Sequence, residues 1–146
     1  EVPLRQELDF IRQYLAIEQV RFNDRLNIRI DTPEDTLDAR VPNLILQPLV
    51  ENAIRHGIAR SAAASTVEIV VRRTNGQLTI DVLDDGPGLP SIPTTAGGGL
   101  GIHNTQKRLK QMYGDDQEFR LRNRKDRGVS ASVKLPFHTG TSRTPS

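Results

Sequence analysis

The chain has 146 residues, the size of one domain that can bury a hydrophobic core without disulfides or metals. It has no cysteine and no apolar run of 18 residues, which excludes a disulfide framework, a thiolate metal site and a transmembrane helix. Its 20 basic and 18 acidic residues are interspersed and only 4% of residues are aromatic, so nucleic acid and membrane surfaces are not expected partners despite a sequence pI of 9.3.

Residues 4–22 are expected to form an amphipathic helix, because apolar side chains recur at alternating steps of four and three residues. The apolar positions are Leu4, Leu8, Ile11, Leu15 and Phe22. Two interpretations stay open: a helix packed on its own domain, and the end of a dimerising helical stem. Since the chain starts inside this pattern and its single methionine is Met112, we expect a piece of a longer protein.

Residues 26–30 alternate between apolar and polar side chains, which predicts a strand. A second helix is expected from Pro42-Asn43 to about His56, with Gly57 as its stop. Pro48 lies inside this helix, where it either introduces a kink or marks the true first turn.

Two further strands, 67–73 and 77–83, are joined through Asn75-Gly76, which is the strongest short hairpin signal. A loop rich in proline and glycine, 85–99, follows them. It leads to a third helix over 101–113, which is expected to end at Gly114. The apolar positions of this helix are Ile102, Leu109 and Met112.

A last hairpin is expected from strands 118–122 and 129–135 around a charged turn. The tail 138–146 is rich in Thr, Ser, Gly and Pro and is expected to be disordered. This order of elements predicts a two-layer α/β (α+β) sandwich, with one mixed sheet and helices on one face. We therefore expect a stem helix over 1–24 and a globular domain over 25–137.

The string 47–57, Gln-Pro-Leu-Val-Glu-Asn-Ala-Ile-Arg-His-Gly, places Asn52, Arg55 and His56 on one side of a helix. An amide oxygen suits magnesium, and a guanidinium fork suits phosphate. Glu51 lies one residue off that face and can pair with Arg55. Taken alone, the string is better explained as a polar helix face that carries an ion pair.

The string 84–88, Asp-Asp-Gly-Pro-Gly, places a carboxylate at the end of an apolar strand. Asp84 can accept a hydrogen bond from an exocyclic amine such as that of adenine, and Gly86 and Gly88 allow the backbone to approach a base closely. The alternative is an ordinary Asp-Gly turn.

The string 97–105 is a glycine loop that opens a helix, where unpaired amides and the helix dipole hold phosphate. It is not a P-loop, because no Gly-Lys-Ser/Thr follows, and it lacks the preceding strand of a dinucleotide fingerprint. The segment between Gly88 and Gly97 is expected to act as a short mobile lid.

With the three strings in this order, the chain resembles the GHKL (Bergerat) ATP-binding fold shared by DNA gyrase B, MutL and sensor histidine kinases. More narrowly, it resembles the LytS/YehU-type histidine kinases. The resemblance rests on 47–57, 84–88, 97–105, Arg108-Leu109, and the pattern around Tyr14-Leu15, Glu18 and Arg21-Phe22. It implies binding of ATP with Mg²⁺ and transfer of the γ-phosphoryl group to a histidine.

The resemblance also implies roles for single residues. Asn52 is the expected magnesium ligand, Asp84 the expected adenine acceptor, and Glu51 and Arg55 are candidate catalytic residues. The full set expected at the nucleotide is Asn52, Arg55, His56, Asp84, Gly86, Gly88, Gly97, Gly99, Leu100, Gly101 and Asn104.

Partners are implied as well: the histidine-bearing dimerisation domain of the same protein, a response regulator, and a second copy in a full-length homodimer. The expected location is cytoplasmic, as part of a membrane-anchored sensor. The chain's histidines, His56, His103 and His138, all lie off the first helix, and the resemblance implies an acceptor histidine that precedes this helix, so the acceptor is expected upstream.

Two departures from the family pattern stand out. Pro48 occupies the position of the glutamate that activates water in hydrolysing members, so fast hydrolysis is not expected. Gly128-Val129 replaces the usual Gly-Thr, which removes one polar contact. Two alternatives remain: a serine/threonine kinase of the anti-sigma-factor type, and a non-catalytic nucleotide-sensing module.

Overall fold

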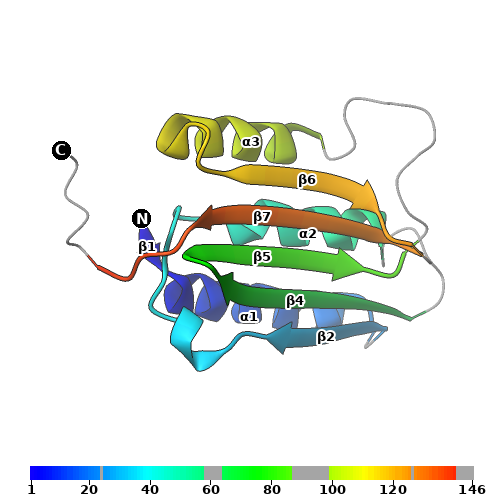
Figure 1. Cartoon of the computed structure of the whole chain (residues 1–146). Helices are drawn as coiled ribbons and strands as arrows, with labels where there is room; N and C mark the ends of the chain where they lie inside the picture. The colour runs from blue at the N-terminus through cyan, green and yellow to red at the C-terminus, as the bar shows by residue number, and fades with distance from the viewer. Residues whose placement is uncertain (24, 58–63, 87–98, 126, 141–146) are drawn as a thin grey trace.

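In the computed structural model, which describes residues 1–23, 25–57, 64–86, 99–125 and 127–140, a five-stranded sheet carries three α-helices on one face (Figure 1). Across the sheet the strands run β2 (Leu26–Asp31), β4 (Ser65–Thr74), β5 (Gln77–Asp84), β7 (Val129–Pro136) and β6 (Glu118–Asn123). The helices are α1 (Leu4–Arg21), α2 (Leu46–His56) and α3 (Gly99–Tyr113). A separate pair joins β1 (Val2–Pro3) to β3 (Arg40–Val41), and η1 (Glu34–Thr36) is a 3-10 turn.

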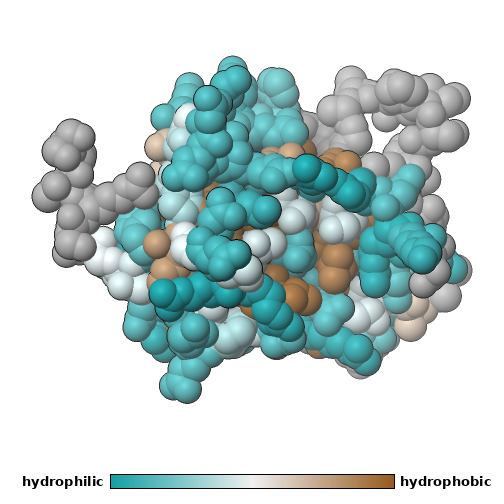
Figure 2. Space-filling view, viewed as in Figure 1, coloured by the Kyte–Doolittle hydropathy of each residue, from teal (hydrophilic) through white to brown (hydrophobic). Residues whose placement is uncertain are grey.

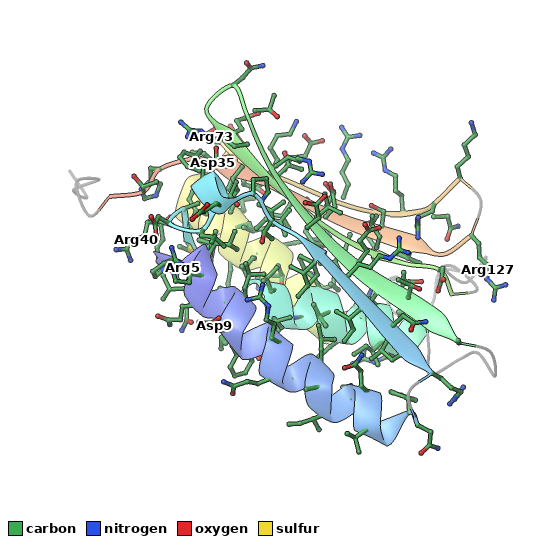
Figure 3. The ribbon with its side chains drawn as sticks, turned by 90° about the horizontal axis from the view of Figure 1, so that it is seen from below. Arg5, Asp9, Asp35, Arg40, Arg73 and Arg127 are labelled. Carbon is green, nitrogen blue, oxygen red and sulfur yellow. The ribbon has the colours of Figure 1, made fainter. Side chains whose placement is uncertain are left out.

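The sheet is mixed, as predicted, because β2 pairs parallel with β4 while every other pairing is antiparallel. The β4–β5 hairpin turns at Asn75 and Gly76, whose φ angles of 53° and 76° are those of a type I′ turn. Residues alternate between a buried and a more open face along β4, β5 and β7. The buried face supports the helices, and Figure 3 shows the two layers from the side.

Helix α1 packs on its own domain. Leu4, Leu8, Ile11 and Leu15 are at most 1% exposed, and they belong to the main hydrophobic core. Phe22 follows the helix, is half-buried, and lies under the guanidinium of Arg21. On the opposite side Phe10, Ile17 and Val20 are exposed. The first interpretation of this helix is thus confirmed, and its role as the end of a stem stays a prediction.

Helix α2 starts at Leu46, so the predicted start at Pro42-Asn43 is wrong. Leu44 has a φ of 60°, which lies outside the helical range and stops the helix from extending upstream. The carboxylate of Glu7 on α1 accepts hydrogen bonds from the amides of Leu44 (2.9 Å) and Leu46 (3.3 Å). Pro48 is therefore in the first turn, where its missing N–H costs nothing, and the second interpretation of Pro48 is the correct one.

Helix α3 begins at Gly99, two residues before the predicted start, and is followed by Gly114 with a φ of 61°. Ile102 and Leu109 are buried as predicted, but Met112 is 43% exposed, so its assignment to the core is wrong. The buried side of α3 instead includes Thr105, three residues after Ile102, and the half-buried Tyr113, four residues after Leu109.

Two predicted segments fall at the edge of what the structure describes. The lid residues 88–97 lie outside the described ranges. In the predicted tail, His138 is placed: its Nε2 lies 2.9 Å from Glu1 Oε1, and its carbonyl accepts from the amide of Arg40. Among the helices of the described ranges, none is long and apolar enough to cross a membrane.

Candidate functional site

The predicted strings meet on helix α2. The end of α2 lies against the turn that follows β5, since a Cβ placed on Gly86 would come 2.4 Å from Gly57 Cα and 2.7 Å from the His56 carbonyl. The start of α2 faces the first turn of α3, where a Cβ on Gly101 would lie 3.7 Å from Pro48 Cβ. Asn52 lies between these two contacts. The three strings therefore form one region of the molecule, as the sequence predicts.

Asp84 is the last residue of β5 and is 1% exposed. Its Oδ1 accepts a hydrogen bond from the Gly86 amide at 2.9 Å, and the Val129 amide also donates to this carboxylate. Burial raises the pKa of Asp84, while these amides and the charge of Arg124 oppose the rise and Asp85 adds to it. The carboxylate is thus largely withdrawn from water. Val129 stands where the family pattern has Thr, and its backbone amide still donates to Asp84.

Three glycines allow the backbone segments around Asp84 to touch. Gly57 ends α2 at a φ of −98°, which any residue can adopt, but a Cβ there would lie 2.6 Å from the Ala53 carbonyl and 3.3 Å from Asp84 Cβ. Gly128 has a φ of 95°, and its Cβ would fall 1.9 Å from the Asp84 carbonyl oxygen. No side chain fits at Gly57, Gly86 or Gly128 unless backbone atoms move.

Two arginines from the turn between β6 and β7 donate hydrogen bonds to the backbone around Asp84. Arg124 Nη1 donates to the Asp84 carbonyl at 2.8 Å, and Arg127 Nε donates to the Gly86 carbonyl at 3.2 Å. From the other side, Asp85 Oδ1 accepts from the Thr66 amide at 2.9 Å. Sequence reasoning missed both arginines, because in the sequence they are only part of a charged turn about forty residues away.

Asn52 is 2% exposed, and its Oδ1 is buried without a hydrogen-bond donor among the described residues. Buried amide oxygens are nearly always satisfied, so this atom fits a ligand that supplies a cation or a donor. Within the described ranges no three His, Asp or Glu side chains cluster as metal ligands. A divalent ion at Asn52 would therefore take its remaining ligands from water and from an anionic ligand.

A cavity of about 280 Å³ separates the starts of α2 and α3. Its lining includes Gln47, Glu51, Gly101 and Asn104. Glu51 Oε1 accepts from Gln47 Nε2 at 2.8 Å, so the carboxylate is bonded to the preceding turn of its own helix rather than to Arg55. The structure thus brings Glu51 together with Gly101 and Asn104 on the side of α2 that faces α3.

The remaining predicted residues are spread over three places. Arg55 is exposed and lines a different cavity of about 220 Å³, beside Tyr14 of α1 and Phe22 just after it, so it is not brought to the Asp84 turn; Glu51 lines this cavity as well. His56 is half-buried at the end of α2. Gly99 and Leu100 form the first turn of α3. Gly88 and Gly97 lie outside the described residues.

A larger hollow of about 410 Å³ lies on the open face of the sheet, which Figure 2 shows as largely hydrophilic. Its charged side chains neutralise one another, because Glu118 pairs with both Arg120 and Lys134. It contains none of the buried polar atoms described above, so it is not the candidate site.

Two protein-family models match the chain. The model for the histidine kinase-, DNA gyrase B- and HSP90-like ATPase matches residues 37–139, and a histidine kinase model matches residues 1–26. Among curated relatives, the chain is 34% identical over 136 residues to the sensor histidine kinase BtsS of Escherichia coli K12, which covers 93% of this chain and 24% of BtsS. It is 32% identical over 148 residues to the sensor protein LytS of Oceanobacillus iheyensis, covering 93% and 25%.

Solved structures share the fold. The catalytic domain of the histidine kinase ThkA matches with a TM-score of 0.68 and 14% identity, over 92% of this chain and 93% of that domain. The histidine kinase domain of a blue-light activated kinase from Erythrobacter litoralis EL346 matches with a TM-score of 0.66 and 24% identity, over 92% and 61%. The chain spans about a quarter of the length of the curated relatives it matches.

Proposed function

Because the chain belongs to the histidine kinase-, DNA gyrase B- and HSP90-like ATPase family, we propose that it is the ATP-binding catalytic domain of a two-component sensor histidine kinase. In this proposal it binds Mg·ATP and transfers the γ-phosphoryl group to a histidine carried by the dimerisation domain of the same protein. Support comes from the family match, the sensor-kinase relatives and the meeting of the three strings on α2.

The observation that carries the proposal is the buried Oδ1 of Asn52, which lacks a donor among the described residues and lies on the helix that ends against Asp84. In the proposal Asn52 holds Mg²⁺, and the ion supplies charge neutralisation for the phosphates. Asp84 accepts a hydrogen bond from the exocyclic amine of adenine. A hydrogen bond to a charged group contributes about 1.5–3 kcal/mol, enough to select adenine over guanine.

Phosphoryl transfer depends mainly on positioning and charge neutralisation, so few protein groups need to react. The first turn of α3, with Gly99 and Gly101, offers amides and a helix dipole to the phosphates, and the side chain of Asn104 follows in the next turn. Pro48 has no side-chain base, so we expect slow hydrolysis by water. Glu51 borders the α2–α3 cavity and is the candidate that could orient an incoming imidazole.

The remaining parts of the proposal concern the full-length protein. The relatives are named as sensor proteins and sensor histidine kinases, and one ThkA structure is a complex with a response regulator protein. We therefore propose a response regulator as the phosphoryl acceptor that follows the histidine. A cytoplasmic position as a domain of a membrane-anchored sensor, and a homodimer of the full-length protein, belong to the same proposal.

Titration calorimetry with Mg·ATP tests the site. Asn52→Ala and Asp84→Ala should each weaken binding by at least about tenfold, because each removes a contact to a charged or buried group. Asp81→Ala is the matched control: it removes an acid from the same strand but from the open face of the sheet, and should leave the affinity unchanged. Equal affinities for Asp84→Ala and Asp81→Ala would refute the adenine assignment.

Transfer is tested separately, by mixing the domain and ATP with a histidine-bearing dimerisation domain. Phosphohistidine is expected, and its loss in Asn52→Ala should follow the loss of ATP affinity. Phosphoserine on a partner protein, or ATP binding without transfer, would favour the serine/threonine kinase or the nucleotide-sensing module.

A further inference from the structure

The turn between β6 and β7 reaches across the sheet end to the acidic turn after β5. The Arg124 amide closes this turn by donating to the Gly128 carbonyl at 2.8 Å. Its guanidinium donates to the Asp84 carbonyl, also at 2.8 Å. Arg127 holds the Gly86 carbonyl, and Figure 3 shows this arginine at the far end of the sheet from Asp35 and Arg73. Both arginines act on the backbone that flanks the proposed adenine acceptor.

We propose that Arg124 is a positioning residue for nucleotide recognition, which acts through the backbone and the charge of Asp84. The proposal rests on the proposed function, because Asp84 is the group through which Arg124 acts. The bond to the Asp84 carbonyl fixes the main chain that directs the carboxylate. The guanidinium also brings a positive charge to a carboxylate that is 1% exposed and has Asp85 beside it.

Only an ionised Asp84 can accept the adenine amine with full strength. Burial raises the pKa of this carboxyl and Asp85 raises it further, whereas Arg124 and the amides of Gly86 and Val129 lower it. His56 and Arg127 are the other charged or titratable groups of the segments that contact this turn. Removing Arg124 therefore shifts the protonation of Asp84 to higher pH, while all the other groups stay as they are.

The chain provides variants that separate the two effects. Arg124→Gln keeps an amide donor for the Asp84 carbonyl but removes the charge, and Arg124→Lys keeps the charge but loses the planar fork. Arg122→Ala is the matched control, since it removes an exposed arginine two residues away on β6. Because every comparison is a ratio to wild type, titration of ATP itself cancels.

Calorimetric Kd values for Mg·ATP are compared from about pH 5 to about pH 8. We expect Arg124→Gln to weaken binding by about threefold to tenfold, with a ratio to wild type that grows as pH falls. Arg124→Lys should show a loss that does not change with pH, and Arg122→Ala should stay near wild type throughout.

Urea unfolding of each variant shows whether the fold is kept. The proposal is overturned if wild type binds ATP and the Kd ratio of Arg124→Gln to wild type equals that of Arg122→Ala at every pH. Absence of ATP binding by wild type would instead refute the proposed function.

Discussion

At the scale of single residues, Asp84 is a buried ionisable group that lowers the stability of the fold. Its carboxylate is 1% exposed and held by the amides of Gly86 and Val129. Burial of a charged group disfavours ionisation, so its pKa is raised despite those bonds. A fold that needed only stability would place a neutral side chain here.

The raised pKa of Asp84 predicts a pH dependence of unfolding. Below the usual pKa of an aspartate the group is protonated in both states, and the folded state carries no cost of ionisation. As pH rises through the usual pKa and then the raised one, the unfolded chain ionises first, so the group progressively destabilises the folded state. Wild type should therefore lose stability relative to Asp84→Asn between acid and neutral pH.

Urea unfolding of both proteins at a series of pH values measures this difference. The two amide bonds favour the ionised carboxylate and so reduce the slope, but the pKa is still raised, so the sign of the slope is diagnostic. A difference that stays flat, or that changes in the opposite direction, would contradict a raised pKa for Asp84.

Sequence reasoning at this scale found Asn52, Asp84 and Gly86, because each lies in a short string whose chemistry can be read locally. It placed Arg55 on the same face as Asn52, whereas the structure directs Arg55 to a cavity beside α1. It could not find Arg124, since the contact with Asp84 depends on how strands far apart in the chain are brought together.

At the scale of elements, α2 depends on α1 for its start. The residue before α2, Ile45, provides no side-chain cap, and α2 has no acidic residue in its first turn. Glu7, 3% exposed, supplies the missing acceptor from α1 by bonding the amides of Leu44 and Leu46. The predicted start at Pro42-Asn43 was wrong for this reason: the local signal was present, but the cap that decides the boundary comes from another helix.

Removal of this cap should destabilise the fold. Glu7→Ala leaves two amides without an acceptor and should lower the free energy of unfolding by about 1–3 kcal/mol. Asp9→Ala is the control on the same helix, because Asp9 is exposed and pairs, among the described residues, with Arg12 alone; it should change stability by less than about 0.5 kcal/mol. Equal urea midpoints for the two variants would show that the Glu7 bonds contribute nothing.

At the scale of the whole molecule, the order of the three helices and of the five strands of the main sheet was predicted correctly, whereas the short β1–β3 pair and the 3-10 turn η1 were not predicted. Hydrophobic periodicity and the Asn75-Gly76 turn carry enough information for that, and the mixed sheet and the family assignment were confirmed. Periodicity could not predict which side chains near the end of a helix face the core. Met112 was expected at an apolar, core-facing position of α3 and is 43% exposed.

A ligand that binds the folded state alone should stabilise the whole domain. Mg·ATP at about one hundred times its Kd adds about 2.7 kcal/mol, which for a domain of this size raises the unfolding midpoint by about 5–10 °C. At the same ATP concentration, Asn52→Ala should lose at least about half of this increase, since a tenfold weaker site adds only about 1.4 kcal/mol. Thermal unfolding followed by circular dichroism, with and without Mg·ATP, checks it, and an equal increase in the variant would exclude Asn52 as a ligand.

The glycine contacts around Asp84 have a consequence for how this region can vary. Gly57, Gly86 and Gly128 touch main chain to main chain, so no side chain stands at the seam that could be exchanged for a larger or smaller one. Substitutions elsewhere in the hydrophobic core do not change the shape of this backbone contact. The backbone therefore sets the shape of this contact, which changes only when the main chain takes another path, while in the proposed function the side chain of Asp84 sets the choice of base.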